Sequence, residues 1–378
     1  MTDPPPRRMR LGLVGGVGGS AIGSSHIAAA RLDGRWELVA GVFSRDPGRT
    51  QAVARELLID SARAYADFNQ MAAEEAGRSD AIDAVTICTP NDTHFEIANA
   101  FLDKGIHVIC DKPLALSVEQ ARGLRAKALE TGLVLAVTYT YSAYPMVRMA
   151  RDMVSDGQLG PVRAVHVEYA SHYQTERFAP KDWQHDPAKA GLLGVVAALG
   201  THAFHLAEFV SGLRVETLAA DLACLDPHHP LDDHAGILLR FEGGVRGCLM
   251  CTSVAHGHEN GLALRILGIK GALVWRQEQP DFMVFSPVAG PSVLLTRGGP
   301  SASAGANRMT RIAAGHPEGY LEAFANLYTA IARVIARGGE GRDGADFPTA
   351  HEGARGVAFM LAAFRSAHAQ TAFVPLDL

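Results

Sequence analysis

Two short segments of the chain carry residue types whose spacing fits redox chemistry with a nucleotide. The glycine-rich run from Gly12 to Gly19 follows an apolar segment and precedes a helical pattern that begins near Gly23. Glycines in this place let the backbone approach a pyrophosphate, and the following helix offers amide donors at its N-terminus. The second segment, Asp111-Lys112-Pro113, places a lysine directly after an apolar run that ends at Cys110. Together the two segments predict a redox enzyme.

The glycine-rich run predicts nucleotide binding because a strand pattern precedes it and a helix pattern follows it. The interval from Gly15 to Gly23 is longer than the usual fingerprint, so the sequence leaves open which amides contact phosphate. The glycines that we expect to bind the cofactor are Gly15, Gly16, Gly18 and Gly23.

Ser44 and Arg45 end the second predicted strand and are expected to meet the adenosine ribose of the cofactor. An acidic residue in this place binds the ribose hydroxyls of NAD, whereas a cation binds the 2′-phosphate of NADP. Arg45 favours NADP, but Asp46 follows it and could favour NAD, and a solvated Arg–Asp turn is the structural alternative. We therefore expect NAD or NADP, with a slight lean to NADP.

Composition limits the partners of the protein. A chain of 378 residues has room for about two domains. The net charge of −5 gives no electrostatic footprint for nucleic acid. The 5 cysteines, odd in number and scattered through apolar runs, are typical of reduced thiols in a cytoplasmic protein. No apolar region has the length of a membrane span, so we expect a cytoplasmic protein with a small-molecule partner, without nucleic acid or membrane.

Two clusters of metal-ligand residue types lack the spacing of a metal site. Cys248 and Cys251 lie in a predicted strand, where positions three apart face opposite sides. His228, His229 and the segment 232–234 lie in a loop bounded by prolines, without helical spacing. We expect no metal.

Short apolar runs alternate with helical patterns up to Val137, which predicts a parallel sheet covered by helices on both faces. The expected strands are Leu11–Gly15, Glu37–Phe43, Ala84–Cys88, His107–Cys110 and Val134–Val137. The expected helices lie near Ser24–Leu32, Gly48–Leu57, Asn69–Ala76, Thr93–Lys104 and Ser117–Thr131.

After about Tyr139 strands follow one another with short turns, which predicts an antiparallel sheet. The expected strands are Val162–Tyr169, Val215–Leu225, Ala235–Phe241, Val245–Val254, Leu262–Gly268 and Gly271–Arg276. Helices are expected near Pro145–Ser155, Gly194–Ser211, Tyr320–Arg337 and His351–Gln370, and a long surface loop over Ser286–Gly315. The fold class is α/β.

Four motifs in a fixed order carry a resemblance to a known family. They are the glycine-rich run, Thr89-Pro90-Asn91-Asp92-Thr93-His94, Asp111-Lys112-Pro113 and Gly200-Thr201-His202. In this respect nearly the whole chain resembles the Gfo/Idh/MocA oxidoreductases. The resemblance implies NAD(P)-dependent oxidation or reduction of a sugar, cyclitol or derivative. It also implies a doubly wound Rossmann domain at 9–138 and, at 139–378, a substrate-binding domain whose large open, mainly antiparallel sheet joins subunits into a homodimer or homotetramer.

The resemblance assigns cofactor-side roles. Lys112 matches the lysine that contacts the nicotinamide ribose and a substrate hydroxyl, and Asp111 stands in place of the family's glutamate. The residues that match the segment along the cofactor are Thr89, Pro90, Asn91 and His94.

On the substrate side, Trp183 resembles the family's tryptophan at the pocket mouth, but Gln184 stands where an arginine belongs. This change removes a charged donor. Tyr141 and His172 lie near pocket-lining segments and are further expected substrate contacts.

His202 matches the family's catalytic histidine, whereas Ala198 stands where the family carries an aspartate one helical turn earlier on the same face. His205 falls where many relatives have a second aspartate. Ala198 and His205 are therefore expected beside the substrate, in a site that has lost one carboxylate.

Hydride transfer needs a base for the hydroxyl proton, or an acid in reverse, which contributes about two to four orders of magnitude in rate. His202 suits this role because an imidazole titrates near ~6.5. Lys112 could stabilise the alkoxide. We predict an NAD(P)-dependent sugar or polyol dehydrogenase or reductase with these two catalytic residues. Two alternatives remain: an enzyme that cleaves glycosides through transient oxidation and elimination, and a catalytically decayed dinucleotide- or sugar-binding protein.

Overall fold

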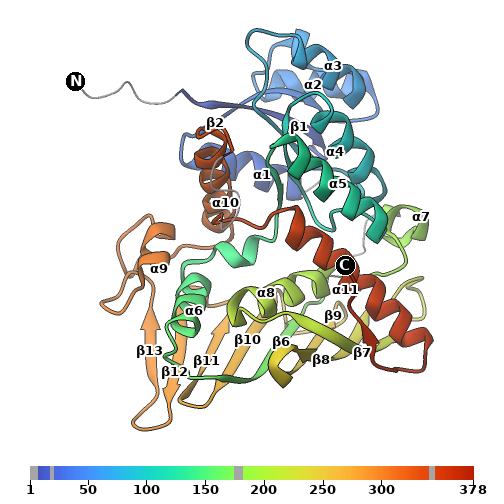
Figure 1. The fold of residues 1–378 in the computed structure, drawn as a ribbon. Helices are drawn as coiled ribbons and strands as arrows, with labels where there is room; N and C mark the ends of the chain where they lie inside the picture. Colours follow the sequence, from blue (N-terminus) through green and yellow to red (C-terminus); the bar gives the residue numbers. More distant parts are fainter. Residues whose placement is uncertain (1–6, 18–20, 174–181, 340–344) are drawn as a thin grey trace. The chain divides into compact units, whose positions relative to one another are not determined.

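The computed structural model describes residues 7–17, 21–173, 182–339 and 345–378. These residues pack into two compact units, and Figure 1 follows the chain through both. Unit 1 contains Met1–Ala115, Glu119–Thr138 and Phe324–Gly353, and unit 2 contains Leu116–Val118, Tyr139–Ala323 and Ala354–Leu378.

Unit 1 is built on a five-stranded parallel sheet with the order β2-β1-β3-β4-β5. Its strands are β1 (Met9–Gly15), β2 (Trp36–Val42), β3 (Ala84–Cys88), β4 (His107–Cys110) and β5 (Leu135–Val137). The helices that lie wholly or mainly in unit 1 are α1 (Ala21–Leu32), α2 (Pro47–Glu56), α3 (Phe68–Ala76), α4 (His94–Leu102), α5 (Val118–Thr131) and α10 (Tyr320–Ile335). The predicted parallel sheet of a Rossmann-type domain is confirmed.

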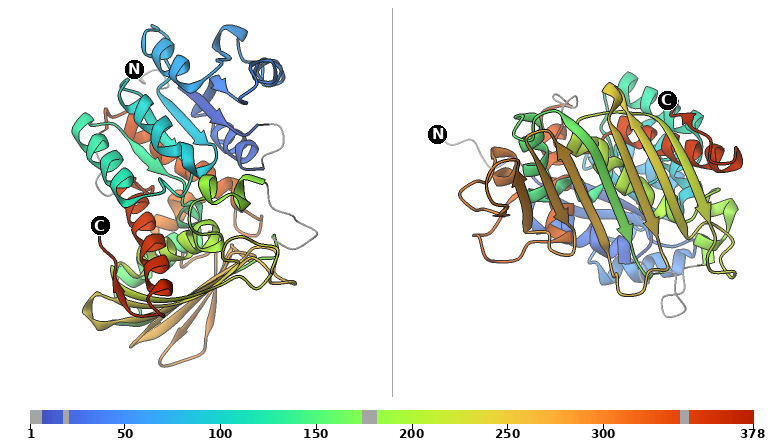
Figure 2. Two further views of the ribbon diagram at one scale, coloured as in Figure 1. Left: turned by 90° about the vertical axis from the view of Figure 1, so that its right-hand side faces the viewer. Right: turned by 90° about the horizontal axis from the view of Figure 1, so that it is seen from below.

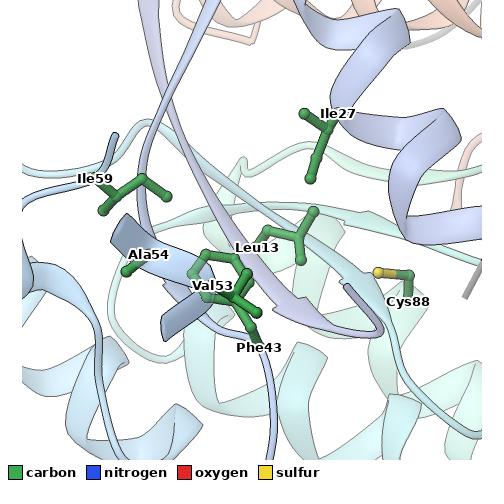
Figure 3. Packing of buried hydrophobic residues seen from close by; sticks show 7 residues of the cluster. All are labelled: Leu13, Ile27, Phe43, Val53, Ala54, Ile59 and Cys88. Atoms are coloured by element: carbon green, nitrogen blue, oxygen red, sulfur yellow. The ribbon is translucent and has the colours of Figure 1, made fainter. Parts of the chain in front are cut away.

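An apolar cluster under the glycine-rich turn holds β1 against the helices beside it (Figure 3). Leu13 of β1 meets Ile27 of α1 and Val53 of α2, and all three are buried. Phe43 and Cys88 join them from the ends of β2 and β3. The cluster therefore fixes the carboxyl ends of neighbouring strands, where an open α/β sheet binds its ligands.

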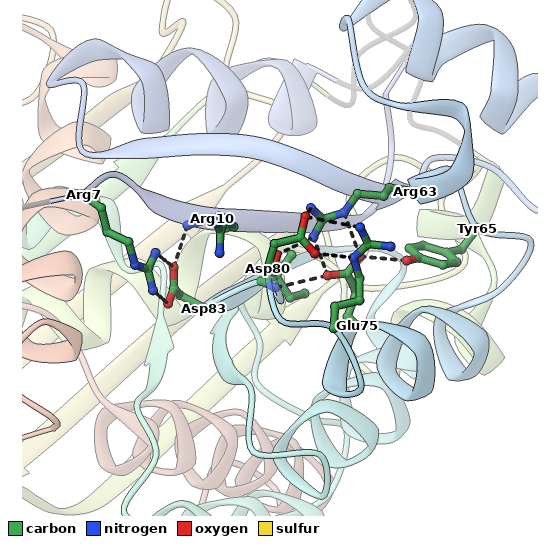
Figure 4. A network of polar contacts seen from close by, with 9 residues as sticks. Arg7, Arg10, Arg63, Tyr65, Glu75, Asp80 and Asp83 are labelled. Atoms are coloured by element: carbon green, nitrogen blue, oxygen red, sulfur yellow. Dashed lines mark hydrogen bonds and ion pairs between the residues drawn. The ribbon is translucent and has the colours of Figure 1, made fainter.

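A buried ion pair between Glu75 and Arg63 joins α3 to the 3₁₀ turn Ser61–Arg63 that follows α2 (Figure 4). The Glu75 carboxylate accepts hydrogen bonds from Arg63 Nη2 at 2.5 Å, the Tyr65 hydroxyl at 2.7 Å and the Ile82 amide at 3.1 Å. Burial and the bond to Glu75 raise the pKa of Tyr65. Because removing one partner would leave a buried charge without compensation, this network is a strong constraint on unit 1.

Residues 324–353 belong to unit 1, although the sequence predicted them within the 139–378 domain. The reason is long-range packing by α10. The Tyr328 hydroxyl lies 2.9 Å from His26 Nδ1 and 2.8 Å from Thr86 Oγ1. The division into a cofactor domain and a substrate domain stays a prediction.

Unit 2 is built on a mixed nine-stranded sheet with the order β13-β12-β11-β10-β6-β9-β8-β7-β14, seen in the right-hand view of Figure 2. Its strands are β6 (Val162–Ala170), β7 (Val215–Ala223), β8 (His234–Phe241), β9 (Arg246–Thr252), β10 (Gly261–Gly268), β11 (Gly271–Arg276), β12 (Phe282–Pro287), β13 (Val293–Thr296) and β14 (Val374–Pro375). The helices are α6 (Pro145–Ser155), α7 (Pro187–Ala190), α8 (Thr201–Ser211), α9 (Ala304–Met309) and α11 (Ala350–His368), and a π-helix spans Val196–Gly200.

The large, mainly antiparallel sheet is confirmed, with two corrections. β6 and β9 pair in parallel, so the sheet is not antiparallel throughout. The predicted surface loop Ser286–Gly315 contains the end of β12, all of β13, which pairs with β12, and helix α9. The predicted opposite facing of the CxxC pair is confirmed, because Cys251 is buried and Cys248 is exposed.

Candidate active site

Gly15 and Gly23, on either side of the glycine-rich turn, have no room for a side chain. Gly15 has a φ of +118°, and a Cβ there would lie 2.7 Å from the Cys88 carbonyl. A Cβ on Gly23 would lie 2.0 Å from the Gly16 carbonyl oxygen. A bare backbone turn that leads into the N-terminus of α1 fits the pyrophosphate of a dinucleotide. Gly18, also predicted to bind the cofactor, lies outside the described residues.

The residues after β2 separate into a structural carboxylate and an exposed cation. Asp46 is the N-cap of α2, because its Oδ1 accepts the Gly48 amide at 2.8 Å. Ser44 is held by Thr50, whose Oγ1 lies 3.0 Å from the Ser44 amide. Arg45 between them is exposed. The Asp46 carboxylate therefore caps α2 through one of its oxygens.

His94 joins the two loops that follow β3 and β4. Its buried ring lies between two carbonyl oxygens, with Nδ1 2.7 Å from Pro113 O and Nε2 3.0 Å from Thr89 O. Pro90 and Asn91 are partly exposed where a 3₁₀ turn begins before α4. His94 therefore supports the predicted cofactor-binding segment from beneath, which is a positioning role.

Lys112 is fixed through its backbone at the end of β4. The Asp111 carboxylate accepts the Lys112 amide at 2.8 Å and the Thr138 hydroxyl at 2.8 Å. Burial lowers the pKa of Lys112, and the nearby Asp111 charge acts in the opposite direction. Asp111 therefore holds the loop and raises the pKa of the Lys112 ammonium against the effect of burial. An aspartate is long enough to make these contacts in place of the family's glutamate.

The segment that carries Ala198 is a π-helix, not the start of a regular α-helix as predicted. The Thr201 amide reaches the Val196 carbonyl, five residues back. Asp232 caps this segment, since its carboxylate accepts the Gly194 amide at 2.6 Å and the Val196 amide at 2.9 Å. Burial raises the pKa of Asp232, and those two amides oppose the rise.

Three tyrosine rings surround the partly exposed His202 on the first turn of α8. Ring centroids of Tyr141 and Tyr139 lie 4.9 Å and 5.7 Å from that of His202, both nearly perpendicular to it. The Tyr169 ring is 6.5 Å away. The imidazole thus sits against an aromatic wall built by β6 and the segment before α6.

His205 lies in a stack of rings. Its centroid is 4.5 Å from Tyr139 and 5.7 Å from Phe209, and both pairs are nearly parallel. His205 is buried, and the guanidinium of Arg151 covers the other end of the stack, 4.4 Å from the Phe209 centroid. The predicted contact of His205 with a substrate stays a prediction.

The other residues predicted on the substrate side lie in different surroundings. Tyr141 is buried, whereas Trp183 and Gln184 are partly exposed in the 3₁₀ turn Asp182–His185. His172 Nδ1 lies 2.7 Å from the His258 carbonyl oxygen, so this ring anchors the turn that precedes β10. Sequence reasoning missed Tyr169, Asn260 and Asp232; inward-facing alternation along β6 is a signal for Tyr169, but no local pattern marks the other two.

The histidine and aspartate cluster near residues 226–234 is built as a loop anchor. Asp233 accepts the Leu225 amide at 2.7 Å and the Asp226 amide at 2.8 Å, and His229 Nδ1 lies 3.1 Å from it. Within the described ranges, no group of three or more His, Cys, Asp or Glu side chains is arranged to hold a metal ion. No helix in the described part of the chain is long and apolar enough to cross a membrane.

Comparisons with known proteins agree with this architecture. Residues 9–139 match the oxidoreductase family with an NAD-binding Rossmann fold, and residues 147–274 match the GFO/IDH/MocA C-terminal domain. The chain therefore belongs to the GFO/IDH/MocA oxidoreductase family. The oxidoreductase YfiI of Bacillus subtilis is 33% identical over 86% of this chain and 85% of its own length.

Solved structures extend the likeness over the whole chain. An oxidoreductase from Sinorhizobium meliloti is 44% identical, with a TM-score of 0.89 over 98% of this chain and 100% of the other. An inositol dehydrogenase homologue from Azotobacter vinelandii, complexed with NAD+, is 35% identical, with a TM-score of 0.93 over 98% and 97%. The same homologue was also solved with NADH and myo-inositol, at 35% identity and a TM-score of 0.92 over 98% of each chain.

Proposed function

We propose that this protein is an NAD(P)-dependent dehydrogenase or reductase that acts on a secondary alcohol, or the matching ketone, of a sugar, glycoside or cyclitol. The observation that carries the proposal is the presence of both Lys112 and His202 in a chain that resembles, over 98% of its length, a homologue solved with NADH and myo-inositol. Asp111 supports it, because its carboxylate fixes the lysine where β4 ends.

The proposed chemistry divides between hydride and proton. A nicotinamide dinucleotide, when bound, would supply the acceptor for the hydride of the alcohol carbon, or the hydride donor for the ketone. His202 takes the hydroxyl proton in the oxidation and returns it in the reduction. The Nζ of Lys112 donates a hydrogen bond to the substrate oxygen and stabilises its developing negative charge. The lowered pKa of Lys112 brings its ammonium closer to the range in which it also exchanges a proton.

For the cofactor, we propose that Arg45 shifts the balance towards NADP. The capping role of Asp46 supports this, because one of its carboxylate oxygens already accepts the Gly48 amide. The NAD+ bound to the homologue supports NAD instead. We therefore expect both cofactors to work, with a modest advantage for NADP.

A steady-state screen tests the proposal. Polyols, inositols, free sugars and glycosides are supplied with NAD+ or NADP+, and reduced cofactor is followed by its absorbance. We expect turnover of at least one sugar or cyclitol with each cofactor. Product formation without added cofactor, from enzyme that retains nicotinamide tightly, would instead favour glycoside cleavage through transient oxidation. Binding of cofactor and sugar with no turnover of any kind would favour a decayed enzyme.

We also propose that the nine-stranded sheet joins subunits into a homodimer or homotetramer. Leu238, Phe282 and Leu294 are 55%, 44% and 61% exposed on strands of this sheet. Leu238 alternates with the buried Ile237 and Leu239, so it lies on the face away from the core. Sedimentation of the wild-type chain and of Leu238→Glu tests this, and a monomeric wild-type protein would contradict it.

A further inference from the structure

Three polar side chains from separate parts of unit 2 form a closed hydrogen-bonded ring, which we call the Tyr–Tyr–Asn ring: Tyr141, Tyr169 and Asn260. The two phenol oxygens are 2.5 Å apart. The Tyr169 hydroxyl donates to Asn260 Oδ1 at 2.6 Å, and Asn260 Nδ2 donates to the Tyr141 oxygen at 3.2 Å. Each member therefore contacts the other two.

The donors can be assigned from this pattern. Because the Tyr169 proton points to Asn260 Oδ1, the Tyr141 proton is the one left for the contact between the two phenols. Each phenol thus donates one bond and accepts one within the ring. Burial raises the pKa of both phenols, so they stay protonated and keep these donors at neutral pH. The Tyr141 hydroxyl is consequently engaged inside the protein and not directed at a substrate.

The backbone around Asn260 is anchored on two sides. Glu278 Oε1 accepts the Asn260 amide at 3.0 Å and the Glu259 amide at 3.2 Å. The Ser171 hydroxyl, just beyond β6, donates to the Glu259 carbonyl at 2.7 Å. The turn before β10 therefore presents the Asn260 amide group to the two phenols with little freedom.

The ring lies directly against the candidate catalytic imidazole. Tyr141 meets His202 edge to face, with interplanar angle 82° and centroids 4.9 Å apart. On its other side Tyr141 stacks on Tyr144, whose hydroxyl lies 3.2 Å from Gln277 Nε2. Tyr141 is thus held at its hydroxyl by Tyr169 and Asn260, and at its aromatic face by Tyr144. These contacts fix the orientation in which it meets the imidazole.

We propose that the Tyr–Tyr–Asn ring is a positioning device: Asn260 and Tyr169 hold the Tyr141 ring, and the Tyr141 ring holds the His202 imidazole in its working orientation. The inference rests on the proposed function of His202 as the proton carrier. Tyr141 contacts His202 through its aromatic group, while its hydroxyl makes the hydrogen bonds of the Tyr–Tyr–Asn ring. Asn260 is a positioning residue that touches neither substrate nor cofactor.

Variants of Asn260 and Tyr141 test the proposal. Asn260→Leu opens the ring, Asn260→Asp keeps the acceptor for Tyr169, and Tyr141→Phe removes one phenol but keeps its aromatic ring. Asn99→Leu is the matched control, because the Asn99 side chain donates its hydrogen bond to Asp103 at the C-terminal end of α4. Turnover is measured with the polyol that the screen shows to be fastest. The imidazole resonances of His202 are recorded without substrate and identified by their loss in His202→Gln.

We expect Asn260→Leu and Tyr141→Phe to lower kcat about tenfold with KM changed less than about twofold, because misplacing a catalytic group slows chemistry more than binding. Both variants shift the His202 resonances. Asn260→Asp recovers most of the lost kcat, and Asn99→Leu matches the wild type. If Asn260→Leu does not fold, Tyr141→Phe and Asn260→Asp carry the same comparison.

Two results would overturn the positioning role. One is a raised KM with unchanged kcat in Tyr141→Phe, which assigns the hydroxyl to substrate binding. The other is unmoved His202 resonances together with normal kcat in Asn260→Leu. Failure of the proposed function looks different: His202→Gln then keeps full turnover, while the resonance shifts in the ring variants still report the contact with the imidazole.

Discussion

The two units hold their candidate catalytic side chains by different means. In unit 1 the loop of Lys112 is held by contacts to its main chain, from the Asp111 carboxylate and from His94 at the Pro113 carbonyl. In unit 2 His202 is held mainly by aromatic surfaces. The contacts to the main chain need only the Asp111 carboxylate and the His94 ring, whereas the aromatic packing depends on the size and orientation of each ring. We infer that the placement of Lys112 depends on few residues, whereas the placement of His202 can be changed by substituting any of the aromatic residues around it.

The largest effect is expected when the ammonium group of Lys112 in unit 1 is removed. Lys112→Ala should leave the fold intact and lower turnover by at least about 100-fold, because the alkoxide loses its stabilising charge. Lys127→Ala is the control, since Lys127 pairs with Asp103 on the surface. Steady-state kinetics with melting curves measure both. Near-normal turnover in Lys112→Ala would remove the lysine from the mechanism. Unit 1 would then hold no catalytic side chain to compare with His202.

The next effect tests how far the substrate side is specialised. Ala198→Asp restores the carboxylate that relatives are expected to carry. We expect it to cost about 1–3 kcal/mol of transition-state binding on the native substrate, because an unpaired carboxylate would be placed against a less polar group. Ala73→Asp, on the exposed face of α3, is the control. Higher activity on simple polyols, without loss on the native substrate, would show instead that the chain only lost an orienting group.

A smaller effect probes the aromatic packing itself. A Cβ on Gly356 of α11 would lie 2.0 Å from the Tyr139 hydroxyl oxygen, so Gly356→Ala must push a ring that contacts both His202 and His205. We expect about 1–2 kcal/mol less stability towards urea and a reduced kcat. Gly123→Ala in α5, where an added Cβ meets nothing within 4 Å, should be neutral or stabilising. Equal behaviour of the two variants would show that the packing around His202 is loose.

The smallest effect concerns cofactor choice. Arg45→Ala should weaken NADP binding by about 1 kcal/mol and leave NAD binding nearly unchanged, because only the 2′-phosphate needs the guanidinium. Titration of protein fluorescence with each cofactor measures this, and Arg55→Ala in α2 is the control. Equal losses for both cofactors, or none, would identify Arg45 as a solvated turn residue. Unit 1 would then bind its cofactor through the backbone alone.

Local patterns predicted the parallel sheet because its strands are short, apolar runs such as Ala84–Cys88, buried at every position. They failed for β12 and β13, which carry exposed apolar side chains such as Phe282 and Leu294 and are separated by a segment that contains glycine and proline. The parallel pairing of β6 with β9 joins strands that are far apart in sequence. Register between distant strands is set by tertiary packing, which a local pattern does not contain.

The candidate site shows the same limit. Motif order predicted Lys112 and His202, because each lies in a short segment of fixed sequence. The Tyr–Tyr–Asn ring joins Tyr169 to Asn260 across 91 residues, so its members have no common motif. Motif register also predicted His205 as a substrate contact, which stays a prediction, and no local pattern indicated its stacking on Tyr139.

The π-helix at Val196–Gly200 has a consequence for how this chain is compared with its kin. A π-helical turn takes up one extra residue without adding a turn to the helix. A relative whose helix is plain α at this point would need a one-residue gap inside the helix to keep His202 matched with its counterpart. For such a relative, an ungapped alignment would pair Ala198 with a residue one position away from the one that occupies the same place in space. The residue that replaces the family's aspartate in this chain is therefore identified by superposing backbones and not by counting positions in a sequence alignment.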